Sequence, residues 1–271
     1  MTFRSCGLRL GFLLALALAL GAAAAADAEV RLERMTSPEL RAAIAAGTTI
    51  ALIPIGGTEQ NGAHMVLGKH NRRVQGLSER IAHELGNAVV APVLAYVPEG
   101  AIDPPTAHMR WAGTISVPEP AFEALLEGAA ASLARHGLRD IFLLGDHGGY
   151  QAALERVAAR FNRSAAARGG ARVHALGAYY RASQSGFAAT LRAQGFADAA
   201  IGEHAGLADT SLALAVDPTL VRRDRLGRPA RPGERDGVRG DPQDASAELG
   251  AAGLAQIVSA SVQAIRAQLR P

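Results

Sequence analysis

The sequence is poor in the residues and motifs on which several protein classes depend. Cys6 is the only cysteine among 271 residues, so a disulfide framework is excluded. Aromatic residues make up 4% of the chain, and no Lys/Arg cluster interleaved with aromatics occurs, which argues against nucleic-acid binding. There is no GxSxG elbow, phosphate loop, GxGxxG or CxxC, and His83-Glu84 lacks the second histidine of HExxH because position 87 is Asn87.

The first 28 residues have the layout of a secretory signal. Arg4 and Arg9 precede an apolar run at residues 10–20, and small residues follow as far as Ala28. The run is shorter than the roughly 20 apolar residues that a spanning helix needs, so we expect cleavage, with an uncleaved membrane anchor as the alternative. The mature protein is then expected in the periplasm or outside the cell, without membrane attachment, without a thiol and with a net charge close to neutral.

The rest of the chain, residues 29–271, is expected to form one α/β domain with a mostly parallel sheet flanked by helices. Apolar runs closed by glycine or turn residues alternate with amphipathic segments over short connections, which is typical of right-handed βαβ units. A Pro/Gly-rich stretch at 217–244 is expected to be a long loop or lid. The predicted strands are 48–57, 88–94, 113–117, 140–146 and 172–180, and the predicted helices are 37–47, 72–85, 118–136, 150–166 and 245–269.

Three loops after predicted strands or between helices concentrate polar side chains. In open α/β sheets, ligands bind beyond the carboxyl ends of the strands, so these loops are expected to meet at one crevice. Carboxylates and imidazoles together suit a divalent metal such as zinc or manganese. The candidates are Glu59, Asn61, His64 and His70 in the first loop, Asp146 and His147 in the second, and Glu203, His204 and Asp209 in the third.

These motifs resemble those of the creatininase family, in the same order over about 200 residues. The family pattern opens with PxGSxEQHGPHLPLGTD after a strand, continues with NGHGGN or NGHYEN, and then has HAGxxET. The corresponding segments here are PIGGTEQNGAHMVLGKH (54–70), HMRWAGTISV (108–117), GDHGGY (145–150), HAGLADTS (204–211) and GDPQDASAELG (240–250).

The resemblance implies a metal site that differs from the family's own. In the family, a glutamate, a histidine and a bridging aspartate of the first motif and a histidine of the second help to hold two divalent metals. Glu59 and His147 keep their identities, whereas Asn61 replaces the first histidine, His70 the bridging aspartate, and Gly149 the glutamate of NGHYEN members. A neutral imidazole cannot bridge two ions as a carboxylate does. We therefore predict one ion, zinc with manganese or iron as alternatives, held by Glu59, His70 and His147.

By the same resemblance, His204 is expected to handle protons during amide hydrolysis. Asp209 stands where the family usually has glutamate, and Asp146 is expected to add a ligand or to orient one. His64 is interpreted as a structural anchor of its loop, and Trp111 either covers the substrate or packs in the core.

Two functions remain open on the sequence alone. The first is a metal-dependent amidohydrolase that cleaves a C–N bond in a small cyclic or linear amide with metal-activated water. The alternative is a catalytically silent relative that binds a small molecule or a metal in the periplasm. The resemblance also implies a homo-oligomer, for which a hexamer is one option.

Overall fold

The computed structural model describes residues 29–164, 169–226 and 237–269. The predicted signal, residues 1–28, lies outside the described residues. Within those residues, no helix combines the length and the apolar character needed to span a bilayer.

A four-stranded parallel sheet forms the centre of the domain, in the order β2-β1-β3-β4. β1 (Ile50–Ile55) pairs along its whole length with β3 (Asp140–Gly145), and β2 (Ala88–Val90) and β4 (Arg172–Ala175) flank this central pair. Every residue of β1 is buried, as expected for a strand covered on both faces. The predicted mostly parallel α/β fold is confirmed.

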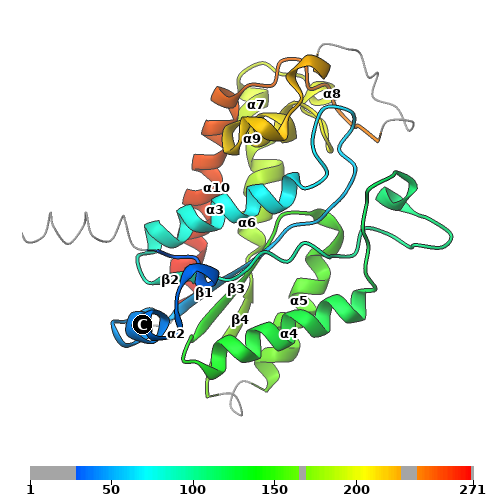
Figure 1. Cartoon of the computed structure of the whole chain (residues 1–271). Helices are drawn as coiled ribbons and strands as arrows, with labels where there is room; N and C mark the ends of the chain where they lie inside the picture. The colour runs from blue at the N-terminus through cyan, green and yellow to red at the C-terminus, as the bar shows by residue number, and fades with distance from the viewer. Residues whose placement is uncertain (1–28, 165–168, 227–236, 270–271) are drawn as a thin grey trace, which may run out of the picture.

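Helices cover both faces of the sheet (Figure 1). One layer contains α3, α6, α9 and α10, and the other contains α2, α4 and α5. α3 begins three residues earlier than predicted, which brings Lys69 and His70 into its first turn. The helices are α2 (Ser37–Ala45), α3 (Lys69–Leu85), α4 (Glu119–Arg135), α5 (Gln151–Arg163), α6 (Gly177–Arg181), α7 (Phe187–Ala193), α8 (Asp198–Ile201), α9 (Leu207–Val216) and α10 (Ala247–Gln268).

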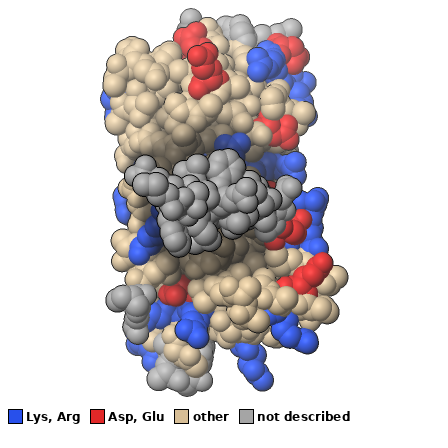
Figure 2. Space-filling model, turned by 90° about the vertical axis from the view of Figure 1, so that its left-hand side faces the viewer, with Lys and Arg blue, Asp and Glu red and all other residues tan. Residues whose placement is uncertain are grey.

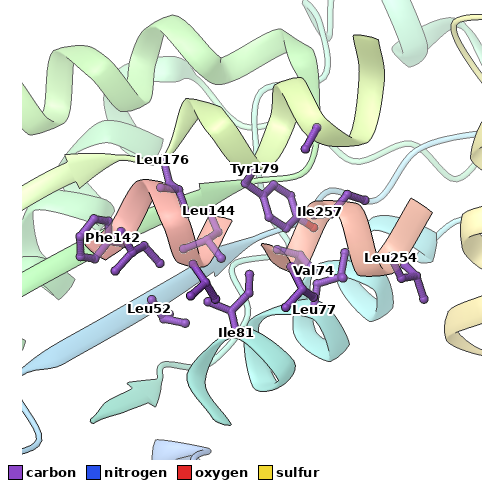
Figure 3. Close-up of a cluster of buried hydrophobic side chains, with 14 of the residues drawn as sticks. Leu52, Val74, Leu77, Ile81, Phe142, Leu144, Leu176, Tyr179, Leu254 and Ile257 are labelled. Atoms are coloured by element: carbon purple, nitrogen blue, oxygen red, sulfur yellow. The ribbon is translucent and has the colours of Figure 1, made fainter. Parts of the chain in front are cut away.

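Side chains alternate between the two layers along each strand. Leu52 of β1 and Leu144 of β3 point to one face, where they pack against Leu77 of α3 and Ile257 of α10 (Figure 3). The neighbouring strand residues point to the other face and pack against α4 and α5. Burial of each such side chain contributes about 1.5–3 kcal/mol, so the two layers hold the sheet edge that carries the polar loops in place.

Three predicted strands differ from the structure. The predicted strand 88–94 ends at Val90, and Leu94 forms an isolated bridge with Ile55. Residues 113–117 form isolated bridges, Thr58 with Ile115 and Val97 with Ser116, instead of a strand. The predicted strand 172–180 ends at Ala175, and α6 begins at Gly177. Its apolar run continues because Leu176 and Tyr179 pack into the core beyond the strand, so the run alone does not mark where the strand ends.

Residues 95–117 form an irregular segment that we call the arm. It leaves the sheet after β2 and runs outward, as the blue-green to green chain on the right of Figure 1, with the short helix η2 (Ala107–Arg110) within it. Hydrogen bonds from the Glu99 backbone N–H to Ser116 Oγ and from Ser116 Oγ to the Gly100 carbonyl close its base.

On the face seen in Figure 2, basic and acidic side chains are interspersed.

Candidate functional site

The loops after β1 and β3 meet at the carboxyl edge of the sheet. Tyr150 joins them, because its hydroxyl donates to the carbonyls of Ile55 and Gly56 and accepts from the backbone N–H groups of Asp146 and His147. The first two predicted loops therefore lie together, as the topology implied.

A cavity of about 970 Å³ opens over this edge. Its wall includes residues from all three predicted loops and from the arm. Those used in the arguments below are His70, His108, Asp146, His147, His204 and Asp209.

One side of the cavity floor is a closed network of charges. The Arg73 guanidinium donates from Nε to Asp146, with the shorter contact at 2.9 Å, and from an Nη to Asp209 at 2.6 Å. Lys69 pairs with Asp209, and Tyr179 donates its hydroxyl to Asp146 at 2.6 Å. Burial alone would raise the pKa values of both aspartates, but the neighbouring cations outweigh it and hold both carboxyls ionised.

His70 belongs to this network. Its Nδ1 lies 2.6 Å from Asp146 Oδ2 and its Nε2 lies 2.7 Å from Glu59 Oε1. Burial and the Lys69 charge oppose protonation, but the hydrogen bonds to the two carboxylates raise the pKa of His70. An imidazole between two carboxylates donates from both nitrogens, so neither nitrogen has a lone pair free for a metal.

Glu59 stands at the boundary of the network. Its Oε1 faces His70 and, at 3.9 Å, the Lys69 ammonium. Its Oε2 has two imidazole nitrogens nearby, His108 Nε2 at 3.1 Å and His147 Nε2 at 3.5 Å, yet no hydrogen bond reaches it. Burial raises the pKa of Glu59, but His70 and Lys69 reverse the effect and hold the pKa well below its usual range.

Glu99 of the arm lies beside Glu59 with both carboxylate oxygens buried and without a hydrogen-bond partner among the described residues. Only 2% of the residue is exposed. Burial, and next the charge of Glu59, raise the pKa of Glu99 to about 8. A buried carboxyl group without a partner is costly, which in a native protein calls for an explanation.

Two histidines complete this second group. Burial lowers the pKa of His147 to about 4 and also lowers the pKa of His108, so both are neutral at pH 7. One ligand atom from each of Glu59, Glu99, His108 and His147 can be chosen so that all four atoms lie within 4.8 Å of one another.

His204 approaches the site from the third loop. Its Nε2 lies 3.0 Å from the Gln60 backbone carbonyl, and its Nδ1 lies 3.7 Å from Glu59 Oε1. Burial and the Lys69 charge lower the pKa of His204 to about 3. The Gln60 side-chain nitrogen lies 3.2 Å from both His204 Nε2 and His108 Nδ1, which ties the third loop to the arm.

The other predicted residues lie around this centre. Asn61 donates to the carbonyls of Glu59 and Val66 within its own loop. His64 is buried with Nε2 3.1 Å from Thr210 Oγ1, as expected for a structural anchor, and Glu203 pairs with Arg239 at the surface. Trp111 lines the cavity.

Four residues of the site carry no role predicted from the sequence: Lys69, Arg73, Glu99 and His108. Lys69 and Arg73 are four residues apart, a spacing that places them on one helix face with the apolar stripe of α3 and could have indicated buried cations. Glu99 stands between Pro98 and Gly100 in a stretch without periodicity, so only its position after a strand could have drawn attention to it.

The comparisons with known proteins identify the family. A sequence model of the creatininase family, described as creatinine amidohydrolase, matches residues 33–265. The chain belongs to the creatininase family. The solved structure of a manganese creatininase superimposes with a TM-score of 0.73 at 26% identity, covering 90% of this chain and all of the other.

Curated relatives within the family include two kinds of hydrolase. Creatinine amidohydrolase of Pseudomonas putida is 29% identical over 197 residues, which cover 71% of this chain and 74% of that enzyme. The mycofactocin precursor peptide peptidase of Mycolicibacterium smegmatis is 32% identical over 115 residues, 41% of this chain and 44% of the peptidase. The matched region therefore spans less than half of the peptidase.

Proposed function

We propose that this creatininase-family protein is a metal-dependent hydrolase that cleaves a C–N bond in a small amide or short peptide. The observation that carries the proposal is the pair of buried carboxylates, Glu59 and Glu99, whose unpartnered oxygens lie beside two neutral imidazoles in the cavity. Its family relatives, an amidohydrolase and a peptidase, both break C–N bonds.

The donor set fits a divalent cation. Carboxylate oxygens and neutral imidazole nitrogens are ligands for zinc and manganese, and a cation would satisfy the oxygens that have no hydrogen bond. Glu59 and His147, two of the three ligands predicted from the sequence, belong to this set. A cation bound there would polarise the amide carbonyl and lower the pKa of a water molecule.

His204 is the residue that we expect to move protons. Its low pKa keeps it neutral at pH 7. The Gln60 carbonyl, at 3.0 Å, is nearer to Nε2 than the Gln60 amide nitrogen, at 3.2 Å, so we assign the proton to Nε2 and the lone pair to Nδ1. Nδ1 is the nitrogen that faces Glu59, so it can accept a proton from the attacking water and return it to the leaving nitrogen.

Asp146 and Asp209 are proposed to position other groups and not to transfer protons. Asp146 holds Arg73, His70 and Tyr179 together. Asp209 accepts from the backbone N–H of Ala205 at 3.0 Å, which fixes the residue next to His204. Both oxygens of each carboxylate are already engaged by cations or hydrogen-bond donors, so neither aspartate has an oxygen free to take a proton from water.

The test is a screen for metal-dependent amine release. Purified protein is stripped with a chelator, reloaded with zinc or manganese, and incubated with cyclic amides, N-acyl amino acids and dipeptides. We expect turnover of at least one class by the loaded wild type, abolished in the stripped protein and in His147→Ala, and reduced at least 100-fold in His204→Ala with metal binding retained. Loaded protein that binds these compounds without cleaving any would overturn the proposal and favour the catalytically silent alternative.

A further inference from the structure

The two oxygens of Glu59 face different surroundings. Oε1 is engaged by two groups of the closed network, His70 at 2.7 Å and Lys69 at 3.9 Å. Oε2 is turned toward His108 and His147 and accepts no hydrogen bond. The network therefore occupies one side of Glu59 and leaves the other side free for a ligand.

The Oε2 side of Glu59 is bounded by residues of the arm as well as by residues of the loops that follow the strands. Glu99 and His108 come from the arm, whereas Glu59 follows β1 and His147 follows β3. Glu99 Oε2 lies 3.6 Å from His147 Nδ1, again without a hydrogen bond. Glu59 Oε2 and Glu99 Oε2 thus lie 3.1–3.6 Å from imidazole nitrogens without a hydrogen bond among the described residues.

Fixed cations stand where a second ion would have to bind on the other side of Glu59. Lys69 and Arg73 neutralise Asp209 and Asp146, and His70 lies between Asp146 and Glu59. A divalent cation placed there would be repelled by these charges and would find both oxygens of each aspartate already engaged.

We infer that the protein holds a single divalent cation between the sheet edge and the arm, with Glu59, Glu99, His108 and His147 as its ligands. This deepens the proposed function and rests on it. His70 of the predicted set serves as a fixed hydrogen-bond donor, and Glu99 and His108 of the arm take its place as ligands.

The inference is tested by metal stoichiometry and affinity, independently of turnover. Stripped wild type is titrated with zinc by calorimetry and its zinc content is measured after dialysis. We expect one ion per chain and an affinity reduced at least tenfold in Glu99→Gln and in His108→Ala. Glu84→Gln and His83→Ala make the same chemical changes on exposed positions of α3 and should leave the affinity within twofold.

Cobalt gives a second measurement that needs no variant. Cobalt-substituted wild type should show the visible absorption of a single site of low coordination number that saturates at one equivalent. Two equivalents of metal per chain, or unchanged zinc affinity in both arm variants, would overturn the inference and leave the hydrolase proposal intact. One equivalent bound through the arm without amide turnover would support the inference and overturn the hydrolase proposal.

Discussion

The two halves of the cavity floor contain similar residues but differ in whether their carboxylate oxygens have hydrogen-bond partners. On the side of Arg73, every carboxylate meets a cation or a hydrogen-bond donor. On the side of Glu99, carboxylate oxygens lie beside imidazoles, and no hydrogen bond from the described residues reaches these oxygens. Buried polar groups that have partners are accounted for by the fold, whereas buried polar groups without partners indicate a missing ligand. The comparison thus separates groups that hold the fold from groups that await a ligand.

Removal of Arg73 should break the paired side. Arg73→Met leaves the buried Asp146 without its main cation and Asp209 with Lys69 alone, so we expect a loss of about 3–5 kcal/mol in the free energy of unfolding. Urea denaturation followed by circular dichroism measures it. Arg73→Lys keeps the charge but cannot contact both aspartates at once, so it should recover only part of the loss. Equal stability of all three proteins would refute the structural role of the network.

The unpaired side should respond to pH. The pKa of Glu99 is raised from 4.5 to about 8 in the folded, metal-free protein, so the folded state binds more protons than the unfolded state between these values. Stability from this group is therefore present below about pH 4.5 and is lost as pH rises toward 8, by at most about 1.4 kcal/mol per pH unit. Unfolding with a chelator at pH 5, 6, 7 and 8 should show wild type losing stability relative to Glu99→Gln.

His147 and His204 affect the same curves in the opposite direction. Their pKa values are depressed, so their contribution is lost as pH falls below 6.5. Both are present in wild type and in Glu99→Gln, which is why the difference between the two proteins isolates Glu99. A difference that does not change with pH would mean that Glu99 has another partner.

Tyr150 joins the loops after β1 and β3, and its replacement should lower the free energy of unfolding by a smaller amount. Tyr150→Phe removes a hydroxyl that bonds four backbone groups at the ends of β1 and β3. The Asp146 N–H and the Ile55 carbonyl keep their mutual hydrogen bond of 3.0 Å, so the loss falls on the Gly56 carbonyl and the His147 N–H and should cost about 1–3 kcal/mol. Because His147 lies on one of the loops so joined, zinc affinity should also fall, which calorimetry would detect. Full stability with full zinc affinity would show that the packing of the strands alone sets the loop positions.

The amount that could be predicted from the sequence differs between these regions. The strands β1 and β3 and the polar loops after them were identified because apolar runs and loop composition are local signals. The roles of residues within the site depend instead on contacts between segments that are distant in the sequence. His70 stands one residue from Lys69 and three from Arg73, and only the packing of α3 against the sheet edge decides that its nitrogens meet Asp146 and Glu59. The role of Glu99 could not be predicted, because its surroundings have no periodic pattern and only the folded position of the arm brings it beside Glu59.

The smallest effect is expected at the surface, where the same kind of pair carries little energy. Glu203 and Arg239 line the cavity and lie 3.2 Å apart, but most of each side chain is exposed. Water screens such a pair, so Glu203→Gln should change the free energy of unfolding by less than about 0.5 kcal/mol. Chemical denaturation of Glu203→Gln and Arg73→Met under the same conditions compares the two losses in the free energy of unfolding. A loss at Glu203 as large as that at Arg73 would mean that burial does not set the difference between the cavity floor and its rim, and the separation of structural from ligand-binding charges would lose its basis.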